Sequence, residues 1–372
     1  MKKIIFKKIS LDIVFFFILT IFSLSSIIWV LQAVNFLDIV VEDGHGLRVY
    51  LYFTFLNLPK IISKIFPFAL FFSFFYILLE YEKNNELLIF WSFGISKKEF
   101  ASFFIKLSFV FFIIQFILTA FIVPKSQSIA RSYIKGSNVD LFEGIIKEKK
   151  FIDTFKSLTI YVDKKTKQGE LENVFLKNNL SNQITFAKRG VFENRKNNKI
   201  LVLYDGQTIT TNDKQTSNIE FKKTDFNISN FTSKTTSVLK IQENSTKKLI
   251  SCLVTINKIK SNIGAFFGFN NCRIDGKKNI IEELYKRLLL PIYFPIFILS
   301  TLMLVLRSKE EEKFNSYKII IFLIGVMLII FSEISVKFLK INLYENIIFL
   351  LLPLFIFFIL RFTFNHMLKS KK

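Results

Sequence analysis

The sequence has little of what most enzymes and metal proteins use for their chemistry. Its 372 residues include two histidines and two cysteines, which is too few for most metal sites built from several His or Cys ligands. It also contains no G-x-x-x-x-G-K-[ST], G-x-S-x-G or H-E-x-x-H motif. Without the first of these motifs the chain cannot hydrolyse ATP by the P-loop route. The sequence therefore predicts neither an enzyme nor a bound cofactor.

Charged residues are scarce in six long stretches in which Phe, Ile and Leu dominate. Phe alone occurs 48 times, and 51% of the residues are hydrophobic, more than a soluble globular protein usually carries. A membrane span needs about 20 mostly apolar residues, and flanking Lys or Arg side chains can extend a shorter one. The stretches close to this length cover residues 13–34, 53–79, 100–123, 284–306, 317–336 and 345–360. They predict a membrane protein with six spanning helices in two groups of three.

Lysine and arginine are unevenly spread over the short segments between these stretches. If the amino terminus is cytoplasmic, the inside segments hold 15 of these residues, whereas the outside short loops hold only Arg48, Lys337 and Lys340. Cytoplasmic loops of membrane proteins carry the excess of positive charge. Both termini are therefore expected in the cytoplasm, with the polar block between the third and fourth stretches on the other side of the membrane.

That polar block, residues 124–278, has the pattern of β-structure. Short alternating segments suggest strands, and Lys188-Arg189-Gly190 and Asp205-Gly206 suggest breaks between them, the second being a strong hairpin signal. The strand candidates cover residues 158–162, 171–176, 183–187, 200–204, 207–211 and 219–228. Six or more short antiparallel strands predict a sandwich or jelly roll. Its interior can form an apolar groove or be filled by its own side chains.

The formal net charge is +22, and residues 124–277 contribute 27 Lys or Arg against 14 Asp or Glu. A basic domain beside a membrane is compatible with anionic lipid partners, and also with a solvated basic surface. Because much of the remaining charge is an orientation signal, nucleic acid is not an expected partner. Cys252 and Cys272 both fall in this block, where an oxidising compartment permits a disulfide; two separate thiols are the alternative.

The densest cytoplasmic pattern follows the second stretch, at about residues 84–94. Asn84 or Asn85 can cap a short helix with Glu86 in its first turn, where the helix dipole favours an acidic side chain. Gly94 is a natural residue just past the end of this helix. One face of the helix carries three apolar side chains, at positions i, i+3 and i+4: Leu87, Phe90 and Trp91.

Two interpretations of this short amphipathic helix are open. It can rest its apolar face on lipid as an interfacial helix. Alternatively, it is a coupling helix that inserts its apolar face and Glu86 into a groove on a cytoplasmic partner. The residue types alone do not decide between them. Ser96 and Glu99 follow as a capping box that starts the third span.

Three ionisable residues lie near the predicted outer ends of spans. Lys60 and Lys64 are four residues apart and share one face of the second span, where they can either snorkel to the interface or meet the phosphates of a lipid headgroup. Glu333 lies in the fifth span, where an ionised carboxylate is unfavourable in free energy. It is a candidate functional residue, although it can also pair with Lys337 at i+4.

These stretches resemble the LptF/LptG permeases, the membrane part of the ABC transporter that extracts lipopolysaccharide from the inner membrane of Gram-negative bacteria. The resemblance covers nearly the whole chain and is carried by Leu58-Pro59, Phe66-Pro67-Phe68-Ala69-Leu70, Asn85-Glu86-Leu87-Leu88, Phe93-Gly94-Ile95-Ser96, Val123-Pro124, residues 158–162, Tyr204-Asp205-Gly206 and residues 282–291. Residues 29–41 are more similar to the first span of α-proteobacterial LptF than to LptG. Asn35 stands where that pattern often has a basic residue.

The resemblance implies six transmembrane α-helices with an inserted periplasmic β-jelly roll. Residues 1–123 would hold the first three helices, residues 124–278 the jelly roll, and residues 279–372 the last three helices and a cytoplasmic tail. The ATPase-coupling residues would be Glu86, Leu87, Phe90, Trp91 and Gly94. The substrate-binding residues would be Gln32, Asn35, Arg48, Lys60, Lys64 and Glu333.

The resemblance also implies partners and a function. The chain would be a multi-pass inner-membrane protein that pairs with an LptG-like permease and stands beside LptC-like and LptA-like periplasmic proteins. An LptB-like ATPase dimer would use the ATP. The expected function is to extract lipopolysaccharide and pass it to a periplasmic bridge toward the outer membrane. The alternative is a membrane-anchored periplasmic lipid-binding or scaffold protein, for which the loop with Glu86 would be dispensable.

Overall fold

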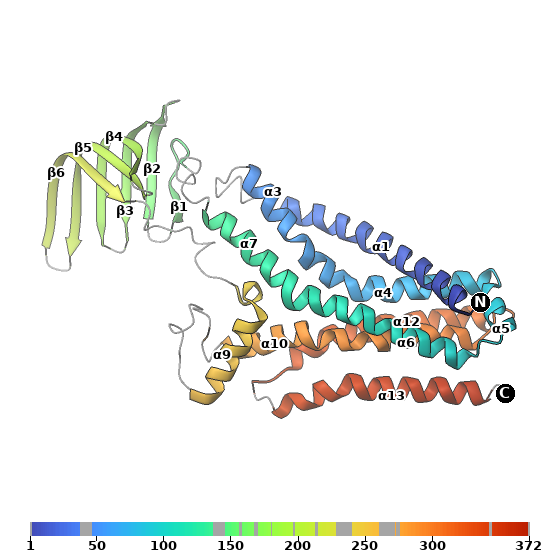
Figure 1. The fold of residues 1–372 in the computed structure, drawn as a ribbon. Helices are drawn as coiled ribbons and strands as arrows, with labels where there is room; N and C mark the ends of the chain where they lie inside the picture. The colour runs from blue at the N-terminus through green and yellow to red at the C-terminus, as the bar shows by residue number, and fades with distance from the viewer. Residues whose placement is uncertain are drawn as a thin grey trace. The chain divides into compact units, whose positions relative to one another are not determined.

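The chain divides into two compact units, each with its own hydrophobic core (Figure 1). The helical unit comprises Met1–Val30, Asn57–Ser128 and Lys240–Lys372, and the sheet unit comprises Leu31–Leu56 and Ile129–Leu239. The predicted polar domain differs from the sheet unit at its carboxyl end, because residues from Lys240 onward belong to the helical unit. The computed structural model describes residues 2–37, 47–136, 146–155, 158–166, 170–179, 181–195, 198–212, 215–227, 240–259, 272, 276–341 and 344–370.

Among these residues, five helical segments are long and apolar enough to cross a membrane, and a bent pair makes a sixth if it counts as one span. The five are Lys2–Asn35, Leu47–Lys83, Lys97–Ile134, Phe314–Phe338 and Tyr344–Lys369, and the pair is Lys277–Leu288 with Leu290–Leu306. Each contains or overlaps one of the predicted stretches. The prediction of a membrane protein with a β-domain inserted between two groups of spans is therefore confirmed.

The helices have the following bounds. The longer ones are α1 (Lys2–Asn35), α3 (Leu47–Leu56), α4 (Leu58–Lys83), α5 (Glu86–Ser92), α6 (Lys97–Ile117), α7 (Val123–Gly136), α9 (Thr246–Ile259), α10 (Lys277–Leu288), α11 (Phe294–Leu302), α12 (Phe314–Ser335) and α13 (Ile347–Ser370). A π-helical turn covers Leu118–Ile122. Short 3-10 turns cover Ile241–Glu243, Leu290–Tyr293, Met303–Leu306, Val336–Phe338 and Tyr344–Asn346.

Helix α11 lies at the centre of the helical unit. Every residue of Phe294–Leu302 is buried, and α4, α6, α12 and α13 pack against it. Aromatic rings fill much of this core: Phe66 stacks on Phe294 with 5.5 Å between the ring centroids, and Phe74 meets Phe104 edge to face at 5.7 Å. A helix that is apolar all round is typical of a protein core or a membrane span, and α11 is surrounded by other helices of the chain. The surrounding helices expose many large apolar side chains outward, as lipid-facing helices do.

Helix α12 packs closely against α4 at Gly325. A Cβ atom at this position would lie 2.0 Å from a ring atom of Phe71, which is itself fully buried. We expect Gly325→Ala to destabilise the protein by about 1–3 kcal/mol, because the ring cannot move without disturbing the core. The melting temperature of the purified protein measures this. Met327→Ala, at a side chain 67% exposed on the same helix, is the control and should change the melting temperature little.

The fourth predicted span is broken rather than continuous. Helix α10 and the segment that begins at Leu290 are bent by 42° at Leu289. Pro291 lies in the turn that follows and Pro295 in the first turn of α11, where the missing N–H groups leave no helical hydrogen bond unmade. The break places the charged end of α10 at the start of the buried α11.

The sheet unit contains a six-stranded antiparallel sheet in the order β1-β2-β3-β4-β5-β6 (Figure 1). The strands are β1 (Ile152–Phe155), β2 (Leu158–Lys165), β3 (Leu171–Asn178), β4 (Gln183–Arg195), β5 (Asn198–Asn212) and β6 (Gln215–Asn227). Each strand pairs with its sequence neighbour, so the described strands form a meander. They contain no crossover of the kind that defines a jelly roll, so this detail of the prediction is not seen in the described residues.

Two of the predicted breaks lie inside long strands. Strand β4 continues through Lys188–Gly190, and β5 continues through Asp205 and Gly206, so the two strands predicted on either side of that dipeptide are one. The hairpin prediction was wrong because the glycine serves a different purpose. A Cβ atom at Gly206 would lie 2.2 Å from the backbone oxygen of Phe186, so the glycine permits a close approach of β5 to β4.

One face of the sheet is covered by its own core. The buried side chains are Leu158, Ile160, Val162, Leu171, Val174, Leu176, Ala187, Leu201 and Leu203, together with Ile146 and Ile152 before and within β1. The predicted inward direction of alternate residues in β2 is confirmed. Apolar side chains of the chain itself therefore fill this face.

A disulfide joins Cys252 of α9 to Cys272. The two cysteines belong to a small buried cluster with Leu249, Ile256 and Ile280, which packs α9 on α10. Of the two alternatives that the sequence left open, the structure has the disulfide rather than two thiols.

Candidate functional site

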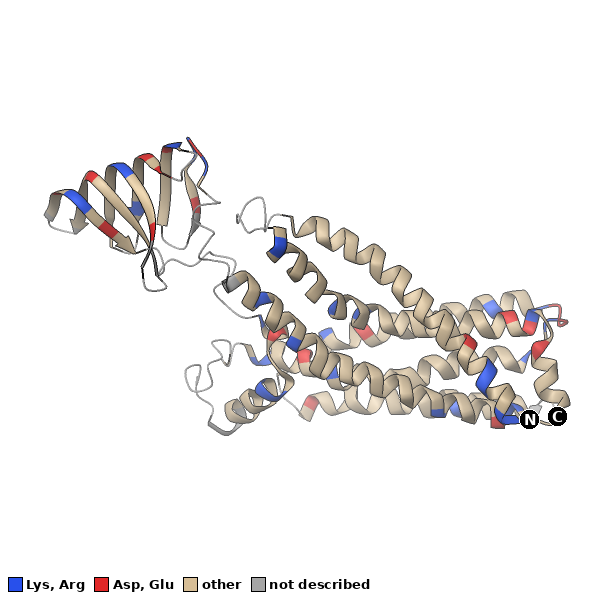
Figure 2. Ribbon diagram, turned by 45° about the horizontal axis from the view of Figure 1, so that its top comes forward, with Lys and Arg blue, Asp and Glu red and all other residues tan. Residues whose placement is uncertain are grey.

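A pocket of about 350 Å³ lies in the helical unit where the broken fourth span bends. Helices α4, α6, α7, α10, α11 and α12 all contribute to its walls. Figure 2 shows that charged residues gather toward the two ends of the long helices and are sparse between them. Six charged residues line the pocket: Lys60, Lys64, Glu283, Lys286, Arg287 and Glu333. Its apolar wall includes Phe68, Leu290, Phe294 and Ile329.

The lysines in this pocket outnumber its free acidic groups. Arg287 and Glu283 pair with each other, with 2.8 Å between Nε and Oε1. That leaves Lys60 and Lys64 of α4 and Lys286 of α10 with one remaining carboxylate, Glu333 of α12. The pocket therefore combines positive charge with aromatic and aliphatic walls. Such a combination suits an anionic amphiphile, because each part of the ligand meets a matching surface.

Arg287 holds the wall of the pocket together. It is almost completely buried, and its guanidinium donates to the backbone oxygens of Asn244 at 2.8 Å and Gln242 at 2.9 Å. It also donates to Oγ1 of Thr246 at 3.1 Å, in addition to its pairing with Glu283. A planar guanidinium can satisfy several acceptors at once, which a lysine cannot do. One side chain thus fixes the segment that follows the sheet unit in sequence to α10.

A second set of polar groups lies on α6 and the π-helical turn after it. Gln115 donates from Nε2 to the backbone oxygen of Ser63 at 2.8 Å, whereas its buried Oε1 has no partner in the described part of the chain. The hydroxyl of Thr119 donates to the backbone oxygen of Arg287 at 2.9 Å. Gln115 therefore offers the pocket a buried acceptor, and π-helical turns are frequent at functional sites.

The predicted substrate-binding residues fall in two places. Lys60, Lys64 and Glu333 line the same pocket, although about 270 residues separate the two lysines from Glu333 in sequence. Gln32, Asn35 and Arg48 belong to the sheet unit, at the end of α1 and the start of α3. Residues 38–41, part of the stretch that resembles the LptF first span, lie outside the described residues.

Local packing fixes the surroundings of Gln32 and Asn35. The hydroxyl of Tyr50 on α3 donates to the backbone oxygen of Ala33 at 2.8 Å, and the rings of Phe36 and Phe53 meet at 4.9 Å. Asn35 and Arg48 are exposed. They are available to a ligand or partner, but nothing in their contacts identifies one.

The predicted cytoplasmic helix is α5, Glu86–Ser92. Its start differs from the prediction, since Asn85 has a left-handed backbone (φ 60°) and makes no side-chain cap. Its end agrees with the prediction, since Gly94 has φ 70°, which glycine adopts without strain. The next cap is also present, with the backbone N–H of Glu99 donating to Oγ of Ser96 at 3.1 Å.

The apolar face of α5, for which the sequence left both lipid and a cytoplasmic partner open, packs into the chain's own core. Leu87 and Phe90 are only 1% and 2% exposed, and the ring of Phe90 contacts those of Phe6, Tyr81 and Phe100. Periodicity reveals an apolar face but not what covers it. The exposed apolar residues of this loop are Leu88, Ile89 and Phe93. Trp91 is half-buried, with the Lys97 ammonium 5.7 Å from its ring centroid.

Ion pairs attach α5 and the start of α6 to the amino end of α1. Lys8 lies 3.4 Å from Glu86, and Lys2 lies 3.2 Å from Glu99. Such exposed pairs contribute at most about 1 kcal/mol each, so they orient the helix more than they stabilise it. Glu86 is thus partly engaged within the chain.

The sequence reasoning assigned no role to Gln115, Lys286 or Arg287. A usable signal was present for the last two. Two adjacent basic residues directly precede a long apolar run that starts at Leu288, which places charge at the end of a span. For Gln115 the signal was weaker, a lone amide within an apolar stretch.

Comparison with known proteins agrees with these features. The chain matches the family described as "Lipopolysaccharide export system permease LptF/LptG" over residues 9–365. It is also 24% identical over 195 residues to the "Uncharacterized protein RP871" of Rickettsia prowazekii (strain Madrid E), an alignment that covers 51% of this chain and 53% of that protein. The chain thus spans about half the length of this curated relative. Because the family match extends over almost every span, the sheet and both sets of candidate residues, this chain belongs to the LptF/LptG permease family.

Proposed function

We propose that this chain is a permease subunit that extracts lipopolysaccharide from the inner membrane. Membership of the family supports this, and so does the absence of a P-loop, which calls for a separate source of energy. The observation that carries the proposal is the pocket that joins Lys60, Lys64 and Lys286 to an apolar wall. Lipopolysaccharide has phosphate groups attached to acyl chains, so it needs both surfaces in one site.

Each group in the pocket has a role in this proposal. The lysines bind the phosphates as point charges, and because they stand on α4 and α10 they approach the headgroup from two helices. Glu333 and Oε1 of Gln115 accept hydrogen bonds from hydroxyl or amide groups of the lipid. Phe68 and Phe294 contact the acyl chains. Gln32, Asn35 and Arg48 are proposed as a further contact set at the end of the first span.

We propose that α5 receives the ATP-driven movement of a partner ATPase. An LptB-like ATPase dimer would bind the exposed face formed by Leu88, Ile89 and Phe93, with Glu86 at its edge. Leu87, Phe90 and Trp91 would then transmit a movement of α5 to α1, α4 and α6, since their rings and side chains pack on those helices. Gly94 permits the tight connection from α5 to α6. Proposed in this way, the buried residues transmit the movement and the exposed ones bind the ATPase.

The remaining parts of the assembly are also proposals. The bias in Lys and Arg supports cytoplasmic termini and a periplasmic sheet unit. A second, LptG-like permease would complete the cavity, and LptC-like and LptA-like proteins would receive the lipid beyond the sheet unit. The likeness to LptF rather than LptG stays a prediction.

The test is a pair of charge reversals, Lys60→Glu with Lys64→Glu. We expect photocrosslinking of lipopolysaccharide to this chain in membranes to fall about tenfold or more, because two attractive contacts with phosphate become repulsive. Lys125→Glu, an exposed lysine of α7 that does not line the pocket, is the matched control. Unchanged crosslinking in the double variant would contradict the proposed phosphate site.

The same system separates the alternative of a membrane-anchored lipid-binding or scaffold protein. Such a protein would not need α5, so disrupting its exposed face would leave delivery of lipopolysaccharide intact. The permease proposal requires delivery to fail.

A further inference from the structure

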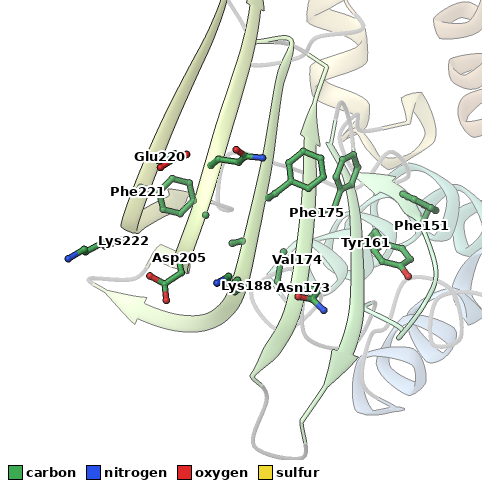
Figure 3. A pocket seen from close by; sticks show the side chains of 14 residues that line it. Phe151, Tyr161, Asn173, Val174, Phe175, Lys188, Asp205, Glu220, Phe221 and Lys222 are labelled. Carbon is green, nitrogen blue, oxygen red and sulfur yellow. The ribbon is translucent and has the colours of Figure 1, made fainter.

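A second groove, of about 970 Å³, lies on the sheet unit (Figure 3). Its floor is a row of residues paired across neighbouring strands: Tyr161 with Phe175, Phe175 with Phe186, Phe186 with Gln207, and Gln207 with Glu220. In β2, β3 and β4 these residues alternate with side chains of the buried core. Because successive side chains of a strand point to opposite faces, the aromatic row lies on the face away from that core.

Four aromatic side chains of this groove, those of Phe151, Tyr161, Phe175 and Phe186, contact one another and are partly or largely exposed. The ring of Phe151 lies 4.7 Å from that of Tyr161 and 6.0 Å from that of Phe175, and Phe175 lies 5.2 Å from Phe186. Phe151 is 70% exposed and Phe186 is 42% exposed. A cluster of exposed rings is costly on a soluble surface and marks a site of interaction. Together these residues form the aromatic platform of the groove.

Charged residues of both signs, together with two amide side chains, line the other end of the groove. Figure 3 shows Phe151, Tyr161 and Phe175 at one end, with Lys188, Asp205 and Lys222 toward the other. Asn173, Gln207 and Glu220 complete the set. The groove therefore offers ammonium and amide donors beside carboxylate and amide acceptors.

This mixture excludes several kinds of ligand. An acyl chain would leave the lysines and carboxylates without partners, and a strongly anionic polymer would face Asp205 and Glu220. An extended peptide adds to a sheet through free backbone groups at an edge, whereas the backbone groups of the strands beneath the platform are already paired. A sugar fits, because its C–H face can stack on a ring while its hydroxyls bond to donors and acceptors around it.

We infer that this groove binds saccharide rings. Two sources share that chemistry: the oligosaccharide of lipopolysaccharide and the glycan of peptidoglycan. We commit to the former, and in that respect the inference rests on the proposed function. In this inference the two sites bind different parts of the lipid: the helical pocket binds phosphates and acyl chains, and the groove binds sugar rings.

The test uses the full chain, purified with its co-purifying subunits in phospholipid nanodiscs, because maltoside and glucoside detergents carry sugars themselves. One arm titrates lipid-free core oligosaccharide released from lipopolysaccharide by mild acid, and the other titrates soluble peptidoglycan fragments. Binding is followed by saturation-transfer NMR. We expect Phe175→Ala with Phe186→Ala to weaken oligosaccharide binding about tenfold or more, because two stacking surfaces are lost. Ile219→Ala, an exposed apolar side chain of β6 that does not line the groove, should change it less than about twofold.

Phe151→Ala provides a second variant outside the strands and should weaken binding in the same direction without affecting the fold of the sheet. Binding in either arm supports a saccharide site, and the arm that binds identifies the source. Absence of binding to the unaltered chain in both arms, or equal binding by the variants, would overturn the inference. So would loss of a co-purifying protein from the variants while saccharide binding stays unchanged, since the groove would then be a protein interface.

The proposed function fails separately from this inference. Lipopolysaccharide crosslinking at the helical pocket is measured on the same preparation. Retained crosslinking without oligosaccharide binding overturns the groove alone. Oligosaccharide binding with crosslinking that does not depend on Lys60 and Lys64 overturns the helical pocket alone.

Discussion

Replacing Arg287 by methionine is expected to destabilise the helical unit by about 3–5 kcal/mol, because it removes the partner of a poorly exposed carboxylate. The change leaves Glu283 without its partner and the backbone oxygens of Gln242 and Asn244 without their donors. The melting temperature of the purified protein reports the loss. Lys286→Met, the neighbouring residue in the same pocket, is the control and should shift the melting temperature far less, because its charge is not tied into this network.

Two further variants test the reason for that loss. Arg287→Lys keeps the charge but cannot reach four acceptors at once, so it should recover only part of the stability. Arg287→Met combined with Glu283→Met removes both charges and should be more stable than Arg287→Met alone, because no unpaired carboxylate remains. If the single and double variants melt together, the unpaired carboxylate of Glu283 does not cause the loss, and the missing bonds from Arg287 to Gln242, Asn244 and Thr246 account for it.

Introducing aspartate at both Leu88 and Ile89 is expected to abolish co-purification with the proposed ATPase subunit. These side chains are 57% and 49% exposed, so the change should leave the melting temperature of the chain nearly unaltered. Burying two such residues in an interface contributes about 1.5–3 kcal/mol each, and placing carboxylates there adds a desolvation cost. Affinity should therefore fall about a hundredfold or more. The measurement is the ratio of ATPase to permease recovered in pull-downs.

Variants of neighbouring residues separate binding from folding. Leu87→Asp, on the buried face of the same helix, should lower the melting temperature itself, because it places a charge in the core. Glu86→Lys loses its attraction to Lys8, and adding Lys8→Glu restores a pair of opposite sign. If the restored pair also restores ATPase recovery, Glu86 acts only within the chain. If recovery stays low, Glu86 contacts the ATPase. A Leu88→Asp and Ile89→Asp variant that retains its ATPase would contradict the coupling surface.

The predictions that came out well from the sequence depend on local chemistry. A run of about 20 apolar residues suits a bilayer wherever it occurs. The helix cap at Ser96 and the position of Gly94 just past the end of α5 were predicted correctly because both depend on residues within one turn. The hairpin at Asp205-Gly206 was predicted wrongly for a related reason. Glycine serves both turns and close backbone contacts, and only the neighbouring strand shows which one applies.

The candidate site depends on contacts between residues far apart in sequence. Arg287 bonds to residues more than 40 positions earlier, and Lys60 shares a pocket with Glu333. No local pattern encodes such pairs. The same limit of local patterns applies to α5. The spacing of Leu87 and Phe90 revealed an apolar face, but it could not show that the first, second and third spans cover this face.

By itself, the sequence determined that this protein is a membrane protein with a β-domain inserted between two groups of spans, since these features depend on the length, charge and alternation of single segments. The tertiary structure decided which residues meet. It buried Leu87 and Phe90 of α5 and exposed Leu88 and Ile89. It made an arginine at the start of an apolar run the residue that holds the wall of the helical pocket, and it placed three aromatic strand residues side by side on the open face of the sheet. Burial and pairing depend on the whole fold, and for that reason they could not be predicted from any one segment.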